Sequence, residues 1–126
     1  MYSLIALYLL VNLSLLKTSY LDKRPSMFLP YASECMCETG VDPKKAYDYI
    51  YHLKFSNDPC FKCFVKCTLV KIGFYTSDGK VSELVSQLNA QELTQDDFNK
   101  CNNTNPDLCE RLYKVSKCVV GLLRAL

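Results

Sequence analysis

The residues with the most distinctive chemistry in this 126-residue sequence are its eight cysteines. Cys60, Cys63 and Cys67 stand at spacings i, i+3 and i+7, which places their sulfur atoms on one stripe of a helix. Cys35 and Cys37, together with Cys60 and Cys63, have a spacing that a zinc site tolerates. The alternative is pairing, because an even number of cysteines in a small secreted chain is typical of a disulfide framework. We therefore expect four disulfides, no metal and no thiol nucleophile.

Secretion is predicted from the N-terminal segment. Residues 4–16 are almost entirely apolar, over a length that suits the core of a signal peptide and is too short to span a bilayer. We expect cleavage after Ser19, which makes residues 1–19 a signal peptide and residues 20–126 one extracellular domain that holds every cysteine. The alternative is that the apolar segment forms a buried N-terminal helix.

The charge balance excludes several classes of partner. The chain has 15 basic and 13 acidic residues, and removal of Lys17 with the signal peptide leaves 14 basic residues against the same 13. Such a nearly neutral domain does not predict binding to nucleic acid, and we expect no membrane insertion once the signal peptide is removed.

The cysteine stripe lies in the best-defined helix of the sequence, at residues 59–72. Asp58 is a good N-cap, Pro59 is pre-set for the first helical position, and Gly73 can end the helix. After a polar lead-in at 20–25, similar signals predict helices at residues 26–38, 43–53, 81–88, 95–102 and 108–122. Pro30 is expected to break or kink the first of these. No stretch alternates as a strand does, so we expect an all-α fold of about six helices.

The last helix carries two cysteines that face opposite ways. Cys109 and Cys118 are nine residues apart, which corresponds to about two and a half helical turns. A helix crosslinked on both sides lies between two neighbours. The central helix at 59–72 and the helix that ends near Cys101 are the available partners.

Six of the cysteines also define a longer spacing pattern. The intervals are C-x27-C-x3-C-x33-C-x7-C-x8-C, through Cys35, Cys63, Cys67, Cys101, Cys109 and Cys118. This pattern resembles that of insect odorant-binding proteins of the pheromone- and general-odorant-binding family. The segments Glu38–Val41 and Asp78–Val81 agree with that resemblance, which covers essentially the whole mature chain.

The resemblance implies a compact six-helix domain, crosslinked by interlocked disulfides, that encloses an apolar cavity. Carried over to this sequence, the implied pairs are Cys35–Cys67, Cys63–Cys109 and Cys101–Cys118. Cys37 and Cys60 are left over, and a fourth bridge, Cys37–Cys60, is the simplest arrangement for them. A swapped arrangement, Cys37–Cys67 with Cys35–Cys60, stays open.

The function that the resemblance implies is that of a soluble carrier of small hydrophobic molecules such as odorants or pheromones. Disulfides stabilise a fold by about 2–4 kcal/mol each, which lets a small core tolerate a void. The positions that match the family pocket are Phe28, Leu53, Val65, Leu69, Phe74, Leu84, Leu88, Phe98, Val115 and Val119. The alternative for each of them is an ordinary core residue.

A few polar side chains are candidates for a secondary role. A tyrosine hydroxyl could bind a polar ligand group, or the ring could simply pack. The tyrosines in question are Tyr49, Tyr51, Tyr75 and Tyr113. His52, the single histidine, is either a pH trigger for ligand release or an exposed residue at a helix end. Asn102 begins an Asn-Asn-Thr glycosylation sequon.

The second hypothesis for function is a secreted protein-interaction or signalling module that keeps the same fold with a filled core. An enzyme is not expected, because the sequence offers no acid–base pair, and neither is a cofactor. A homodimer and a chemoreceptor partner are both left open by the sequence.

Overall fold

The computed structural model describes residues 3–8, 20–82 and 95–125. Residues 3–8 are helical, and the other two ranges contain the helices α2 (Tyr20–Thr39), α3 (Pro43–His52), α4 (Pro59–Ile72), α6 (Gln95–Lys100) and α7 (Leu108–Arg124). The fold is all-α, as expected, and the described residues contain no strand beyond an isolated bridge between Tyr75 and Val81. In these ranges no helix has both the length and the apolarity needed to cross a membrane.

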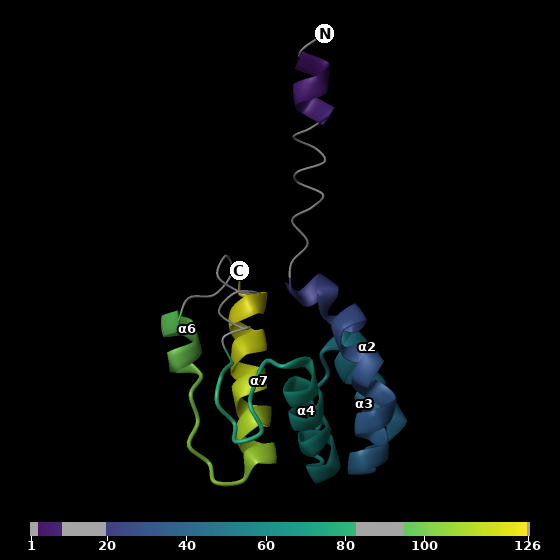
Figure 1. The fold of residues 1–126 in the computed structure, drawn as a ribbon, viewed down its shortest axis with the longest axis vertical. Coiled ribbons are helices and arrows are strands. Elements are labelled where there is room, and N and C mark those ends of the chain that lie inside the picture. Colours follow the sequence, from purple (N-terminus) through teal and green to yellow (C-terminus); the bar gives the residue numbers. More distant parts are fainter. Residues whose placement is uncertain (1–2, 9–19, 83–94, 126) are drawn as a thin grey trace.

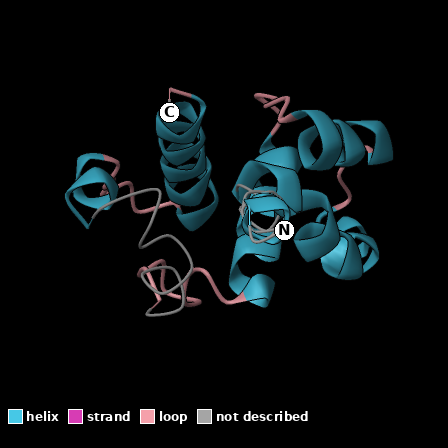
Figure 2. Ribbon diagram, turned by 90° about the horizontal axis from the view of Figure 1, so that it is seen from above, coloured by secondary structure: helices cyan, strands magenta, loops and turns pink. Residues whose placement is uncertain are grey.

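Helix α4 is the centre of the domain. It lies between α7 on one side and α2 with α3 on the other, and it contacts all three (Figure 1). The predicted boundaries are confirmed: the Asp58 carboxylate accepts a hydrogen bond from the Phe61 N–H at 3.0 Å, and Gly73 ends the helix with φ +95°. The view from above shows the helices on both flanks of α4 (Figure 2).

Helix α2 is longer than the sequence predicts. It begins at Tyr20, so the lead-in expected at residues 20–25 is helical, and both Pro25 and Pro30 lie inside it. The prediction was wrong because it treated proline as a helix boundary. A proline removes one hydrogen bond and kinks a helix, but packing of the flanking turns can hold the helix together. Here Phe28 and Ala32 provide that packing, since both are buried.

The remaining helix boundaries follow their caps closely. Asp42 caps α3 and Asp107 caps α7, each accepting from a backbone N–H at 2.9 Å. Helix α6 ends at Lys100, two residues before the predicted end. Of the helix expected at residues 81–88, only Val81 and Ser82 are described, and neither is helical.

Three disulfides crosslink the domain with the pairing that the resemblance implies. Cys35–Cys67 joins α2 to α4, Cys63–Cys109 joins α4 to α7, and Cys101–Cys118 joins the end of α6 to α7. The Cα–Cα distances of these bridges are 5.7, 4.6 and 5.5 Å, in the usual range for disulfides. Because Cys35 and Cys63 are both paired, the zinc alternative that used them is excluded.

The expected fourth bridge, Cys37–Cys60, is absent, since both of these cysteines are free and exposed. The reason is geometric. Cys35 points toward α4 to reach Cys67, and a residue two positions further on a helix points about 200° away. Cys60 lies two turns before Cys67, roughly 10 Å along the α4 axis. The swapped arrangement is excluded as well, because Cys35 is bound to Cys67.

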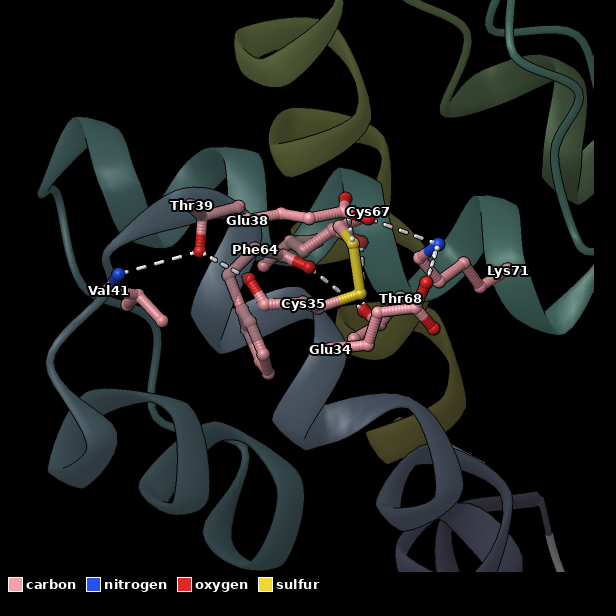
Figure 3. The surroundings of a disulfide bond; sticks show 10 residues. Glu34, Cys35, Glu38, Thr39, Val41, Phe64, Cys67, Thr68 and Lys71 are labelled. Atoms are coloured by element: carbon pink, nitrogen blue, oxygen red, sulfur yellow. Dashed lines mark hydrogen bonds and ion pairs between the residues drawn. A yellow bond between two sulfur atoms is a disulfide. The ribbon is translucent and has the colours of Figure 1, made fainter.

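Charged side chains surround the α2–α4 bridge. The Lys71 ammonium lies 2.8 Å from a Glu34 carboxylate oxygen and 3.3 Å from one of Glu38, and the hydrogen bonds that it donates to both carboxylates raise the Lys71 pKa (Figure 3). The other Glu38 oxygen lies 3.3 Å from the Cys67 sulfur. A disulfide sulfur carries no proton, so this is a close contact and not a hydrogen bond.

An aromatic cluster fills the space between the central helices. The Tyr49 ring meets the rings of Phe28, Phe55, Phe61 and Phe64 edge-on, with centroids 5.4–6.5 Å apart. Tyr113 of α7 closes the cluster against Phe55 and Phe61. Burial of this much aromatic surface is a large apolar contribution to the stability of a small domain.

The state of the two free thiols can be measured directly. We expect iodoacetamide to label two of the eight cysteines in denatured but unreduced protein. Peptide mapping should place one label on Cys37 and the other on Cys60. A variant with both residues changed to serine should take up no label and melt at an unchanged temperature. Unlabelled wild-type protein would instead show that a fourth bridge forms.

Phe61 tests the importance of the aromatic cluster. Phe61→Ala should destabilise the protein by about 3–5 kcal/mol in urea denaturation with the disulfides intact, because the side chain is fully buried among rings. Tyr51→Ala is the matched control, because Tyr51 is 52% exposed, and its loss should change stability by at most about 0.5 kcal/mol. Equal losses in the two variants would contradict the assignment of the core.

Candidate functional site

A pocket of about 400 Å³ opens between the loop that follows α4, helix α6 and the first half of α7. Its apolar wall consists of Tyr75, Val81, Phe98 and Val115. Amide, hydroxyl and cationic groups complete the lining, from Lys80, Asn99, Asn102, Asn103, Thr104 and Arg111, with Gly79 between them. The pocket thus combines an apolar wall with many hydrogen-bonding groups, so its lining is more polar than that of a typical small-molecule site.

A tight turn forms one side of this pocket. The Thr76 N–H donates to the Lys80 carbonyl at 2.8 Å, and the Lys80 N–H donates to the Thr76 hydroxyl at 3.1 Å. Gly79 has φ +84°, and a Cβ atom there would lie 3.0 Å from a Leu108 methyl carbon and 3.2 Å from an Arg111 nitrogen. Glycine therefore lets the turn approach α7 closely enough to form the pocket wall.

Arg111 is fixed at the rim by the loop between α6 and α7. Its Nε donates a hydrogen bond to the Asn105 carbonyl at 2.6 Å, and the Asn105 N–H donates to the Asn103 side-chain oxygen at 2.8 Å. The guanidinium keeps further N–H donors for a polar group in the pocket.

Tyr75 links the pocket to the aromatic cluster. It is 7% exposed, and burial raises the pKa of its hydroxyl to about 12, with a smaller effect from Tyr49. The Tyr49 hydroxyl in turn lies 3.4 Å from the Ser116 hydroxyl. Tyr75 is therefore a neutral phenol at physiological pH, able to donate or accept a hydrogen bond but not to act as an anion.

The residues predicted to bind ligand fall into three groups. Phe98 and Val115 line the pocket. Phe28, Val65, Leu69 and Phe74 are buried in the core, and Leu53 and Val119 are partly buried against it. Leu84 and Leu88 lie outside the described residues. The structure therefore brings two of the ten to one pocket, and their contact with a ligand stays a prediction.

The polar candidates are equally dispersed. Tyr49 and Tyr113 are buried in the aromatic cluster, while Tyr51 is exposed and stacks on Tyr47. His52 is the exposed last residue of α3, which agrees with the second of its two interpretations. Asn102 is exposed at the rim of the pocket, so its sequon is accessible.

Sequence reasoning missed Arg24, which is 1% exposed. Its Nη1 donates to the carbonyls of Tyr49 and Ile50, both at 3.2 Å, and its guanidinium carbon lies 4.5 Å from the centre of the Phe28 ring and 4.6 Å from that of Tyr49. Arg24 belongs to the stretch that was interpreted as a polar lead-in. The helical start of α2, which the sequence did not reveal, carries it into the interior.

A second pocket, of about 340 Å³, lies beside the disulfides Cys35–Cys67 and Cys63–Cys109. Glu38, Lys66 and Lys71 contribute charge to its wall, so it is less suited to an apolar molecule. In the part of the chain that the structure describes, no three histidine, cysteine or acidic side chains gather as a metal site would require.

Comparison with known proteins identifies the family. The model of the PBP/GOBP family matches residues 17–121, which include all six cysteines of the spacing pattern and every described helix of the domain except the end of α7. No curated protein and no solved structure matches the sequence. The family match agrees with the all-α fold and with the three disulfides. The chain therefore belongs to the PBP/GOBP family, the pheromone-binding and general odorant-binding proteins of insects.

Proposed function

We propose that the protein is an extracellular carrier that binds small hydrophobic molecules, such as odorants or pheromones, in the 400 Å³ pocket beside α6. The observation that carries this proposal is the pocket itself, in a chain of the PBP/GOBP family. Its volume falls within the range of about 300–1,000 Å³ that is usual for small-molecule sites. Secretion after removal of residues 1–19 and delivery of the ligand to a chemoreceptor are parts of the same proposal.

The lining suggests how such a ligand would lie. An apolar chain would pack against Phe98 and Val115, while a polar end group would meet the amides of Asn102 and Asn103 and the Arg111 guanidinium at the rim. Burial of each CH₂ contributes about 0.8 kcal/mol, so a chain of about ten to fifteen carbons has enough driving force for micromolar affinity after the cost of association. Binding of this kind forms no covalent bond and involves no catalysis.

A protein-interaction module is the second candidate, and the packing of the interior favours it. Phe28, Phe61 and Phe64 are fully buried, so the space between the central helices is filled with rings. Tyr47 and Tyr51 of α3 are exposed and stack on each other, and they form an aromatic surface that a protein partner would contact. The two functions differ in one measurable property, which is affinity for small apolar molecules.

A substitution that fills the pocket distinguishes them. Val115→Phe should weaken binding of dodecanol at least about tenfold, because the added ring occupies the space of the ligand and a tenfold change corresponds to only about 1.4 kcal/mol. Displacement of a fluorescent apolar probe by dodecanol measures the affinity, and circular dichroism confirms that the variant is folded.

Val70→Phe is the matched control, because Val70 lines the second pocket and the substitution adds the same volume there. It should leave dodecanol affinity unchanged. If folded wild-type protein does not release the probe when long-chain alcohols, esters or aldehydes are added, the carrier function is wrong. If Val70→Phe weakens dodecanol binding and Val115→Phe does not, the ligand binds in the second pocket.

A further inference from the structure

The polar part of the 400 Å³ pocket has one sign of charge. Among the described residues, its lining includes two cations, Lys80 and Arg111, and neither an aspartate nor a glutamate. Amide and hydroxyl groups add further hydrogen-bond donors, from Asn99, Asn102, Asn103, Thr104 and Tyr75. A cleft lined by positive charge attracts negative groups, so this lining favours a ligand whose polar end is an anion.

The two cations differ in how far their charge is already compensated. The Lys80 ammonium lies 3.7 Å from an Asp78 carboxylate oxygen, and the Lys80 side chain is 80% exposed. Solvent and Asp78 therefore weaken its effect in the pocket. Arg111 forms no ion pair with any described residue. The uncompensated charge of the pocket is therefore that of Arg111.

The guanidinium of Arg111 is held in place on one side and keeps its outer edge for a ligand. Its Nε donates to the Asn105 carbonyl at 2.6 Å, and its Nη1 would lie 3.2 Å from a Cβ atom on Gly79, so the group lies against the turn that forms the pocket wall. Nη1 and Nη2 have no hydrogen-bond partner in the described part of the chain. A carboxylate matches the edge that these two nitrogen atoms form, because each oxygen accepts one N–H.

The neighbouring polar groups suit the same head group. The Asn103 side-chain oxygen accepts a hydrogen bond from the Asn105 N–H at 2.8 Å, so the NH₂ donor is the part of that amide that stays available. Burial raises the pKa of Tyr75 to about 12, so its hydroxyl is neutral at physiological pH and does not repel an anion. Neutral donors beside a guanidinium stabilise a carboxylate further.

We propose that the pocket selects amphipathic acids, of the class of medium- and long-chain fatty acids, with the carboxylate on Arg111 and the chain against Phe98 and Val115. The inference rests on the proposed carrier function and adds to it the chemistry of the ligand head group. One uncompensated guanidinium balances a carboxylate, whereas a phosphate monoester would bring nearly two negative charges. A short hydrophilic acid lacks the apolar chain whose burial offsets the loss of hydration.

The experiment compares dodecanoic acid, methyl dodecanoate and dodecanol as competitors of a fluorescent apolar probe at about pH 7.5. The three compounds share one alkyl chain, and only the acid is charged at this pH. Wild-type protein should bind the acid at least about tenfold more tightly than either neutral compound, because a hydrogen-bonded charge pair forms only with the acid.

Three variants locate the head group. Arg111→Met removes the charge and should abolish the preference for the acid while dodecanol still binds. Arg124→Met is the matched control, because it removes the same charge from an exposed position on the same helix, about 20 Å further along its axis. Arg124→Met should retain the preference. Lys80→Met should retain most of it, because Asp78 and solvent already compensate that charge.

A measurement on wild-type protein keeps the test independent of how Arg111→Met folds, since that variant also loses the contact with Asn105. Added sodium chloride should weaken binding of dodecanoic acid, because salt screens the attraction between the carboxylate and a half-buried guanidinium. Dodecanol binding should not weaken, because it involves no charge. The ratio of the two affinities should therefore fall as the salt concentration rises.

The possible contrary results separate the two proposals. If all three compounds displace the probe equally well, or if salt leaves the preference unchanged, the carrier function stands and recognition of a carboxylate is wrong. If Arg124→Met or Lys80→Met abolishes the preference and Arg111→Met does not, the assignment to Arg111 is wrong. If none of the compounds displaces the probe from folded protein, both the carrier function and this inference are wrong.

Discussion

Two disulfides that leave the same helix constrain everything around them. Cys63 and Cys67 are one turn apart on α4, and they tie it to α7 and to α2. A helix that is crosslinked on both sides at this short spacing stays in contact with both neighbours, so its side chains between the helices are excluded from water. Phe61 and Phe64 of α4 fit this environment, because both are apolar and fully buried between the crosslinked helices. The fold therefore combines a short chain with a dense centre.

The periphery is built differently. Helix α6 has six residues and joins α7 through Cys101–Cys118, on the side of α7 away from α4 (Figure 1). The loop that carries Gly79 reaches α7 near the same place. Where a short helix and a turn meet a longer helix, their side chains leave space between them, and the 400 Å³ pocket is found there. The helices crosslinked through α4 are therefore densely packed, whereas the periphery of the domain beside α6 leaves space for a pocket.

Local signals in the sequence predicted much of this structure, and long-range ones predicted little. The caps Asp42, Asp58 and Asp107 gave helix starts because they depend on the nearest few residues. The disulfide pairs came from the resemblance to a family, since spacing alone leaves many pairings open.

Helix periodicity tells which way a side chain points but not how far away the next helix lies. For that reason the free state of Cys37 and Cys60 and the division of the candidate ligand residues between core and pocket could not be foreseen. Arg24 was missed for a similar reason, because a polar residue before two prolines gives no local sign of burial.

The carboxylates beside the α2–α4 bridge have a consequence for its chemical lifetime. Reduction of a disulfide requires an anionic thiolate to approach one sulfur in line with the S–S bond. Glu38 holds a carboxylate oxygen 3.3 Å from the Cys67 sulfur, and Glu34 adds a second negative group that Lys71 neutralises only in part. An incoming thiolate is therefore repelled at the exposed end of this bridge, while Cys35 is shielded by burial. Electrostatic repulsion of this kind slows thiol–disulfide exchange and lengthens the lifetime of the Cys35–Cys67 bridge in the presence of reducing thiols.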